Sequence, residues 1–368
     1  MPHRRLQLLV VGNGATAVDA AGTNYVNKHT CQFLIDLAAR GHAVTSLEVQ
    51  EDFDLDSSLY DRAIPAGLIR VLSFRWGNPL SRPRALATGA LAVLKADFVH
   101  LFYPGSLSRR IAGLCRRLGK PYGIYLRGER FGGDQSEEAL FRGARFVACV
   151  SQTLAERVAP FNADVVVIRP MLDLSAANAV RRPARAAREG PFRLLFVGRL
   201  EEPKGIPELI EAAHMLEDRG LDFTLTLVGG GPFHASLLRR FGDGPEDRVR
   251  VVGAVADPDR LARYFEEADL LVLPTHHEGF PRVLYEAMIK STTVVTTMVG
   301  GIPGLMRHEE NCLAVPIGDA AAIADAVERL AGDPALLERL AEKGLATVLD
   351  VLANRPSHLE AVMSRLDG

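Results

Sequence analysis

The sequence predicts an α/β protein with two Rossmann-like, doubly wound domains that face a central cleft. A chain of 368 residues exceeds what one hydrophobic core usually organises, so two domains are expected. Each half opens with an apolar strand that runs into glycine, at 6–11 before Gly12 and at 192–197 before Gly198. Strands and amphipathic helices then alternate, as they do in parallel sheets. In such sheets a ligand binds outside the carboxyl ends of the strands, where both sets of glycines are expected.

The first half is expected to form a domain over residues 1–174. Its first helix carries Val26, Phe33 and Leu37 on one apolar face and ends at Gly41, the usual position of a C-terminal glycine. A strand is expected directly after this helix, over residues 43–49. Further strands of this domain are expected over 98–101, 122–126, 146–150 and 165–168.

The second half is expected to form a domain over residues 192–350. Residues 175–191 are rich in alanine, arginine and proline and show no strand pattern, so they are expected to connect the two domains. Residues 351–368 are expected to form a helical tail that packs back on the first domain. The predicted strands of the second domain are 192–197, 223–228, 249–252, 270–273 and 293–297, and its predicted helices are 261–268, 282–290 and one capped by Asp319.

Composition argues against several classes of protein. The net charge of −2 gives no overall field that would attract nucleic acid. The four cysteines, Cys31, Cys115, Cys149 and Cys312, lie far apart without metal-ligand spacing, so neither a zinc site nor a disulfide framework is expected. The apolar run at 6–11 is too short for a signal sequence or a membrane span. A cytoplasmic protein is therefore expected.

A basic segment follows the first strand of the second domain. It reads Gly198-Arg199-Leu-Glu-Glu-Pro-Lys204-Gly205 and precedes a helix with Pro207 in its first turn. Arg199 and Lys204 can converge there on a diphosphate, the arginine as a planar fork and the lysine as a point charge. Taken alone, such a pair is more often part of a solvated loop.

A pair of glutamates marks a second segment of the same domain. Glu278 lies in the loop after an apolar strand, and Glu286 lies in the helix that follows. The backbone N–H groups of Gly279 and Phe280 can meet an anion, while the two carboxylates can accept hydrogen bonds from sugar and ribose hydroxyls. Two glutamates at this spacing are common by chance, but the strand, turn and helix around them make the signal more specific.

Together these motifs resemble the retaining glycosyltransferases of glycosyltransferase family 4 in order and spacing. The resemblance covers residues 192–335 and rests on the segments 198–205, 229–232, 252–255, 278–286 and 294–303. The first half is similar only in outline, through Gly22, the helix that ends at Gly41 and the strand near His100. The resemblance implies the GT-B fold, with a nucleotide-sugar donor on the second domain and the acceptor on the first.

The resemblance also implies roles for individual residues. Arg199 and Lys204 would bind the donor diphosphate and stabilise the leaving group. Glu278 would contact the transferred sugar, and Glu286 would hold the ribose. No metal and no cofactor are expected, and the acceptor would be a sugar, a lipid-linked molecule or a small molecule in the synthesis of cell-envelope glycans or secondary metabolites. The remaining residues would line the donor (Gly198, Gly230, Gly253, Val255, Gly279, Phe280) or face the sugar or acceptor (Gly22, His100, Arg127).

The chain departs from the family at three positions. Ser291 stands where the family commonly has glycine, and Gly304 stands where it commonly has glutamate. Arg127 follows a predicted strand at a place where many members carry a histidine that faces the sugar. An arginine stays protonated and cannot act as a base, but it can bind a sugar hydroxyl or an anionic acceptor. The alternative is a salt bridge from Arg127 to Glu129 or Asp134 that only orders the loop.

Three other interpretations stay open. Asp54 and Asp56 form the DxD pair by which a different glycosyltransferase fold binds a metal, although no buried strand leads into them. Gly12 and Gly14 begin a dinucleotide fingerprint and would suggest an oxidoreductase, but the third glycine is missing and Glu48 is the sole acid near the end of the next strand. The third interpretation is a non-catalytic subunit that binds sugar nucleotide, against which the intact charged set of the second domain argues.

Residues 101–145 are locally basic. They contain nine arginines or lysines against four acids. A solvated helix face is the ordinary explanation. The alternative is a face for an anionic acceptor or for peripheral contact with the inner membrane surface.

Overall fold

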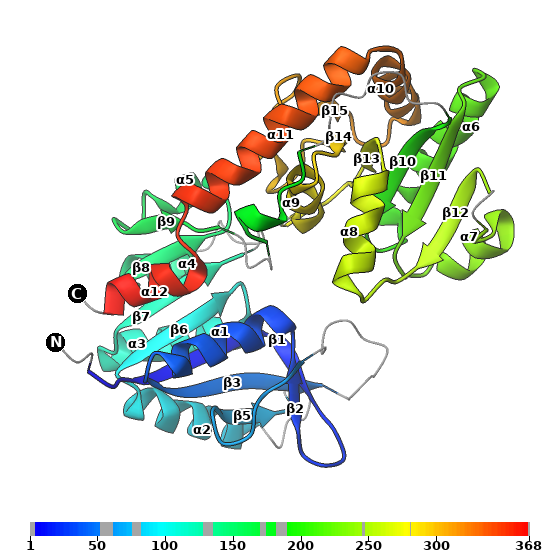
Figure 1. Ribbon diagram of the computed structural model, residues 1–368. Helices are drawn as coiled ribbons and strands as arrows, with labels where there is room; N and C mark the ends of the chain where they lie inside the picture. Colours follow the sequence, from blue (N-terminus) through cyan, green and yellow to red (C-terminus); the bar gives the residue numbers. More distant parts are fainter. Residues whose placement is uncertain are drawn as a thin grey trace. The chain divides into compact units, whose positions relative to one another are not determined.

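The chain divides into two compact units (Figure 1). Unit 1 comprises Met1–Leu172 and Pro356–Gly368, and unit 2 comprises Asp173–Arg355. Each unit is built on one largely parallel sheet with helices, which confirms the predicted α/β class. The computed structural model describes residues 4–51, 62–75, 82–127, 135–169, 174–181, 190–244, 247–279 and 281–366.

The sheet of unit 1 is doubly wound. Its parallel strands follow the order β5-β3-β1-β6-β7-β8-β9, so the direction of winding reverses between β1 and β6. Two short strands, β2 and β4, extend it in antiparallel fashion. The strands are β1 (Gln7–Val18), β2 (Asn24–Val26), β3 (Ala43–Glu51), β4 (Arg62–Ala63), β5 (Arg70–Phe74), β6 (Phe98–Tyr103), β7 (Tyr122–Leu126), β8 (Phe146–Cys149) and β9 (Val165–Val167).

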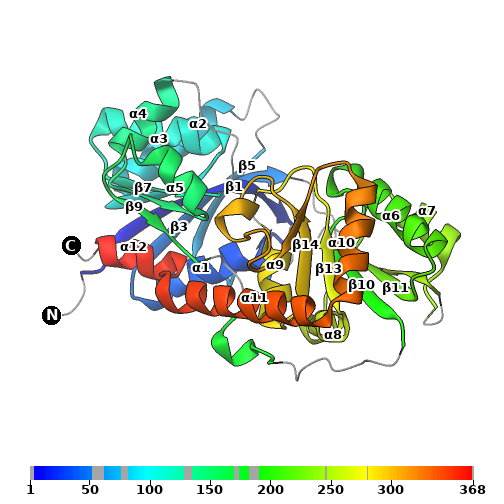
Figure 2. The same cartoon turned by 90° about the horizontal axis from the view of Figure 1, so that it is seen from above.

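Helices cover both faces of this sheet. Helices α1 and α12 lie side by side on one face, and α2 and α3 lie on the other (Figure 2). The apolar stripe of each helix explains its packing, because α3 buries Leu107, Ile111 and Cys115 at helical spacing. The helices of unit 1 are α1 (Lys28–Ala39), α2 (Arg82–Lys95), α3 (Ser106–Leu118), α4 (Gln135–Gly143), α5 (Gln152–Val158) and α12 (His358–Leu366).

The start of unit 1 differs from the prediction. Strand β1 does not end at Gly12 but continues to Val18 through an irregularity between Val11 and Ala15. Val26, which was predicted on the first helix, lies on β2 instead. The helix begins only after Asn27, whose side chain accepts the N–H of His29 and so caps α1. Because the glycines lie within a strand and no helix follows them directly, the dinucleotide fingerprint lacks its strand-turn-helix context.

The sheet of unit 2 is parallel throughout and has the order β12-β11-β10-β13-β14-β15. This is the doubly wound order, with its reversal between β10 and β13. The predicted strands at 192–197, 223–228, 270–273 and 293–297 are confirmed at their stated bounds. The strands are β10 (Phe192–Val197), β11 (Phe223–Val228), β12 (Val249–Gly253), β13 (Leu270–Leu273), β14 (Thr293–Thr297) and β15 (Leu313–Val315).

Helices of unit 2 also pack in pairs. Helix α6 lies against α10, and α8 lies against α9. Asp319 caps α10 by accepting the N–H of Ala322, as its position in the sequence predicts. The elements are η1 (Ala176–Asn178), η2 (Glu202–Lys204), α6 (Ile206–Asp218), α7 (His234–Phe241), α8 (Pro258–Glu267), α9 (Arg282–Ile289), η3 (Ile302–Gly304), α10 (Ala320–Gly332) and α11 (Pro334–Asn354).

Ser291 holds an unusual backbone conformation at the end of α9. Its φ angle of 52° lies in the left-handed region that glycine adopts most easily. Its hydroxyl donates to the carbonyl of Val180 at 2.7 Å, and the N–H of Val180 donates to Ile289 at 2.9 Å. The serine side chain therefore connects the segment 174–181 to α9. A glycine at this position has no side chain and could not make this hydrogen bond.

The last helix of the chain, α12, belongs to unit 1. The ring of His358 stacks on Phe33 of α1 at 4.1 Å between centroids, and its Nε2 lies 2.7 Å from Nε2 of His100 on β6. Arg365 at the other end donates to Asp164 at 2.8 Å. The boundary between the units falls after Arg355, a few residues later than the start of the tail suggested by the sequence.

Candidate functional site

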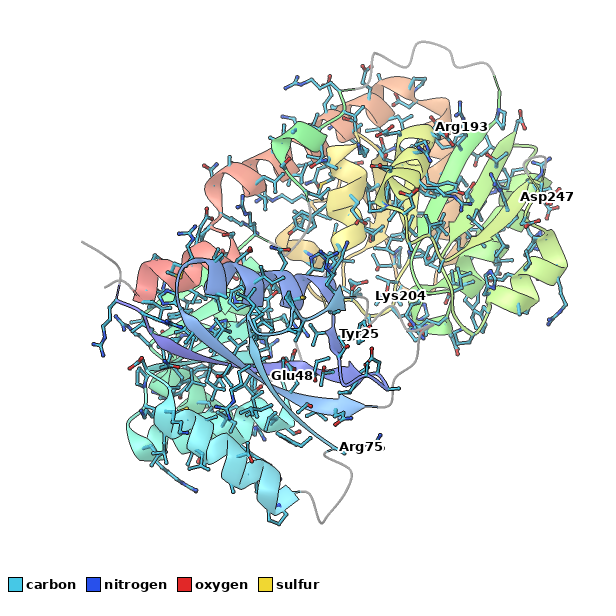
Figure 3. The ribbon with its side chains drawn as sticks, turned by 60° about the horizontal axis from the view of Figure 1, so that its bottom comes forward. Tyr25, Glu48, Arg75, Arg193, Lys204 and Asp247 are labelled. Carbon is cyan, nitrogen blue, oxygen red and sulfur yellow. The ribbon has the colours of Figure 1, made fainter. Side chains whose placement is uncertain are left out.

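The basic segment of unit 2 lies where the winding of its sheet reverses. Gly198 and Arg199 follow β10, and Lys204 ends the short helix η2 before Gly205 begins α6 with a φ angle of 72°. In an open parallel sheet, the crevice outside the carboxyl ends of the strands at this reversal is the usual ligand position. Figure 3 labels Lys204 on this loop.

Lys204 and Glu278 form a close ion pair. Lys204 Nζ donates to Glu278 Oε2 at 2.6 Å, and the two side chains are only 20% and 15% exposed. Lys204 comes from the loop after β10 and Glu278 from the loop after β13, so the pair joins the two strands between which the winding reverses. Arg199 is largely exposed and pairs with Glu201 at 3.0 Å. The structure thus brings two of the predicted catalytic residues into contact.

Backbone contacts hold these two loops together. The carbonyl of Pro203 accepts the N–H of His276 at 2.9 Å and the hydroxyl of Thr275 at 3.1 Å. A Cβ atom on Gly205 would lie 2.1 Å from the carbonyl oxygen of Pro274, so only glycine fits there. Since this frame fixes both loops, the charges that they carry have defined positions.

Glycines allow the other loops to approach the same edge of the sheet. A Cβ on Gly229 would lie 1.8 Å from the carbonyl oxygen of Gly198, and a Cβ on Gly300 would lie 1.7 Å from that of Glu278. Both glycines also have positive φ angles, 147° and 58°. The glycine motifs of the sequence therefore pack the loops after β10, β11, β13 and β14 against one another, backbone to backbone.

The remaining predicted donor residues lie on or near these loops, at the end of β12, or on α9. Gly230 accepts the N–H of Leu200 at 2.8 Å, and Gly253 accepts that of Gly229 at 2.8 Å. Val255 is half-buried in the loop after β12, and Gly279 lies next to Glu278. Glu286 is half-buried on α9, which has no side-chain cap at its N-terminus. Phe280 lies outside the described residues.

His276, in the loop after β13, contacts both η2 and α6. Its backbone N–H is bound by Pro203, and its Nε2 lies 2.9 Å from Glu208 Oε1 on α6. Gly304, the other departure from the family, ends the short helix η3. Within the described ranges, no group of three or more histidine, cysteine, aspartate or glutamate side chains could hold a metal ion. Asp54 and Asp56 lie outside those ranges, as do Glu129 and Asp134.

Gly22 and His100, both predicted to face the sugar or acceptor, lie in different surroundings in unit 1. Gly22 is exposed in a turn, where its N–H donates to Asp19 at 3.0 Å and its φ angle is 83°. His100 is 2% exposed, and its ring packs between Phe33, Phe146 and His358. The ring of His100 is therefore enclosed by aromatic side chains and contacts α12, and a contact between His100 and a sugar stays a prediction.

Arg127, in contrast, belongs to a polar cluster at the carboxyl end of the sheet of unit 1. Its guanidinium donates to Asn13 Oδ1 at 2.5 Å and lies 5.6 Å from the ring centre of Phe102. Asn13 in turn donates to the carbonyl of Pro104 at 3.0 Å. Asn13 lies within β1 next to its irregularity, and Pro104 and Arg127 follow β6 and β7, so the cluster lies where the winding reverses in unit 1.

Glu48 adds a buried carboxyl to this cluster (Figure 3). It accepts from Ser46 at 2.7 Å, and a Cβ atom on Gly12 would lie 1.8 Å from its Oε2. Burial raises the pKa of Glu48 to about 7, although Ser46 and the charge of Arg127 oppose the shift. Asn13 was not singled out from the sequence, and Glu48 was considered only for a dinucleotide. In the sequence, both residues stand out as polar positions near the end of an apolar run.

The raised pKa of Glu48 predicts how stability depends on pH. The folded chain holds the proton of Glu48 more tightly than the unfolded chain. The contribution of this group to the free energy of unfolding is therefore full below the ordinary pKa of 4.5 and is lost as the pH rises to about 7. The loss amounts to about 3 kcal/mol. In Glu48→Gln this loss should be absent, as measured by urea unfolding across that pH range. Glu156→Gln, an exposed change in the same unit, should keep the wild-type profile, and parallel profiles for wild type and Glu48→Gln would contradict the assignment.

Comparison with known proteins gives the fold and a family match. Residues 191–333 match the family model described as Glycosyl transferases group 1. The amylovoran biosynthesis glycosyltransferase AmsK of Erwinia amylovora is 38% identical over 153 residues, 40% of this chain and 37% of the relative. A D-inositol 3-phosphate glycosyltransferase of Pseudarthrobacter chlorophenolicus is 36% identical over 204 residues, 52% and 48% of the two chains. The chain therefore spans about half or less of the length of these relatives.

A solved structure resembles the whole chain. The crystal structure of HepE (Alr3699) from Anabaena, in complex with UDP, has a TM-score of 0.68 and 18% sequence identity, and the likeness covers 98% of both chains. Together with the two parallel sheets, this shows the GT-B fold. None of the described helices is both long enough and apolar enough to span a membrane.

Proposed function

We propose that this chain, whose residues 191–333 match the group 1 glycosyltransferase model, is a retaining glycosyltransferase that needs no metal. It would transfer a sugar from a nucleotide diphospho-sugar to a glycan, a lipid-linked molecule or a small molecule, in the cytoplasm. The observation that carries the proposal is the Lys204–Glu278 pair at the reversal of winding in unit 2. The relative named for amylovoran biosynthesis supports an acceptor in cell-envelope glycan synthesis.

The charges of the site fit the demands of sugar transfer. Breaking the anomeric bond builds negative charge on the leaving phosphate, and cations fixed in advance stabilise that charge more in the transition state than in the ground state. Lys204 is fixed by the loop frame, whereas Arg199 is exposed and free to turn from Glu201 toward a phosphate. Two cations are sufficient to meet a diphosphate, which is the physical basis for proposing that no metal takes part.

Glu278 would have two roles in this scheme. Without a donor its carboxylate neutralises Lys204 at 2.6 Å. When the diphosphate takes over the lysine, the carboxylate becomes available to accept a hydroxyl of the transferred sugar. Glu286, eight residues further along the chain on α9, would accept the ribose hydroxyls. The loops that contain Gly198, Gly230 and Gly253 would surround the nucleotide with backbone groups.

One experiment tests the reaction class. The chain is incubated in EDTA with nucleotide diphospho-sugars of different bases, with water as the acceptor of the sugar. Release of the nucleotide diphosphate is followed, and proton NMR gives the anomeric configuration of the sugar that is released. The proposal expects release with one of the donors, and a first-formed product with the same configuration as the donor. Inverted configuration would contradict the retaining mechanism, and strict dependence on a divalent cation would contradict the metal-independent one.

The two glutamates should have separable effects. Glu286→Ala is expected to weaken binding of free nucleotide and of donor alike, by about tenfold, because it removes a charged acceptor of hydrogen bonds. Glu278→Gln should leave the affinity for free nucleotide nearly unchanged and lower turnover instead. Calorimetry with the nucleotide diphosphate and initial rates with the donor measure the two effects. Equal loss of nucleotide affinity in both variants would contradict this division of roles.

A further inference from the structure

Helix α2 of unit 1 exposes leucines to solvent. Its core side is formed by Gly89, which packs near Ile111 and Leu47, and by the buried Val93. On the outer side, Leu91 and Leu94 are 58% and 52% exposed, and Leu86, about two turns before Leu94, is 39% exposed. Leucines three residues apart share one side of a helix. The helix thus presents an apolar stripe that nothing in the described part of unit 1 covers.

Helix α3 continues this surface. Its last residue, Leu118, is 43% exposed, and the side chain of Lys120 donates to the carbonyls of Leu94 and Ala96 at 2.8 and 2.9 Å. The C-terminal ends of the two helices therefore lie together, as the figures also show (Figures 1 and 2). Of the six exposed large apolar side chains in the described part of the chain, four belong to α2 and α3. Isolated exposed leucines are ordinary, but a cluster marks an interaction surface.

The charge of this surface has one sign. Helices α2 and α3 contain no aspartate or glutamate, whereas Lys95 on α2 and Arg116 and Arg117 on α3 are exposed. The single acid between the two helices, Asp97, accepts the N–H of Gln7 at 2.8 Å. Other cations of the basic stretch are used within the fold, because Arg109 pairs with Glu137 at 2.6 Å and Arg142 with Glu138 at 3.6 Å. In a chain with a net charge of −2, this concentration is local.

We propose that the leucine and cation surface of α2 and α3, defined by Leu86, Leu91, Leu94, Leu118, Lys95 and Arg117, docks on the surface of an anionic lipid bilayer. Leucines enter the boundary between headgroups and acyl chains, while lysine and arginine meet the lipid phosphates. A second copy of the chain fits less well, because two such surfaces facing each other would bring like charges together. The inference goes beyond the proposed reaction and does not depend on it.

Vesicle sedimentation tests this surface. The wild-type chain is expected to bind vesicles that contain phosphatidylglycerol, to leave vesicles of phosphatidylcholine alone, and to dissociate as salt rises. The double variant Leu91→Ser/Leu94→Ser and the double variant Lys95→Glu/Arg117→Glu should each lower the bound fraction by about tenfold. All four side chains are exposed, so the thermal melts of these variants should match the wild type.

Matched controls come from unit 2. Ile317→Ser removes a similarly exposed apolar side chain, and Arg263→Glu reverses an exposed charge on α8. Both should bind vesicles as the wild type does. Failure of the wild type to bind anionic vesicles would overturn the proposal. Full binding by the leucine variant would also overturn it, because binding would then depend on charge attraction alone. A concentration-dependent dimer that the leucine variant abolishes would show that a second copy occupies the surface instead. Nucleotide release from a soluble donor should be unchanged in all variants.

Discussion

Lys204→Ala should lower turnover of the nucleotide diphospho-sugar by about a hundredfold or more, the cost of removing one preorganised group that stabilises developing charge. Lys204 is the fixed cation of the site, held between the loops after β10 and β13 and 2.6 Å from Glu278. Arg199→Ala should have a comparable effect on turnover. Because Arg199 is largely exposed and pairs only with its neighbour Glu201 within the described contacts, this second variant should keep wild-type stability.

A double variant separates catalysis from stability at Lys204. Removing the lysine leaves the half-buried carboxylate of Glu278 without its cation, so Lys204→Ala should also lower the melting temperature. Adding Glu278→Gln removes the unpaired negative charge and should restore the melting temperature, but not turnover. Initial rates and thermal melts of the three variants give the result. Normal turnover in both Lys204→Ala and Arg199→Ala would remove the diphosphate assignment.

Gly300→Ala should be strongly destabilising. Its Cβ would lie 1.7 Å from the carbonyl oxygen of Glu278, and its φ angle of 58° is unfavourable for any residue with a side chain. Collision and backbone strain together should destabilise the chain by about 3 kcal/mol or more. The loop that carries Glu278 would have to move, so donor affinity should fall as well. Urea unfolding and nucleotide calorimetry measure the two losses.

Gly318→Ala is the matched control for Gly300→Ala. Gly318 lies in the same unit with a φ angle of 76°, but a Cβ there would meet no atom within 4 Å. Gly318→Ala should therefore lose only the stability that a side-chain residue costs at a positive φ angle, about 1 kcal/mol. If the two variants lost equal stability, the close approach of Gly300 to Glu278 would not be what requires glycine at that position.

The fold of unit 2 could be predicted in detail because its sequence is locally consistent. Apolar runs such as 192–197 and 270–273 are bounded by glycine, proline or polar residues, and the strands coincide with them. Unit 1 was less predictable near its start. The glycines at 12 and 14 suggested the end of a strand, whereas β1 passes through them with an irregularity. Hydrogen bonding to β3 overrides local preference there, and a single sequence does not reveal such pairing.

The site could be predicted by residue type but not by contact. The sequence places Arg199, Lys204 and Glu278 on loops at the carboxyl ends of strands, yet only the structure shows that Lys204 bonds to Glu278. The burial of His100 could not be predicted either, because it depends on α12, more than 250 residues away in the sequence. Contacts of such long range leave no local pattern.

Binding of nucleotide sugars tests the central claim most directly. Thermal shifts are measured in EDTA with UDP-, GDP-, ADP- and dTDP-sugars, for the wild type, Lys204→Ala and Arg263→Glu, since a ligand that binds only the folded state raises its stability. The account predicts that at least one of these donors raises the melting temperature of the wild type and of Arg263→Glu, and that Lys204→Ala loses most of the shift. A shift that is as large in Lys204→Ala as in the wild type, or no shift with any nucleotide sugar, would contradict a donor site built on Lys204 and Glu278.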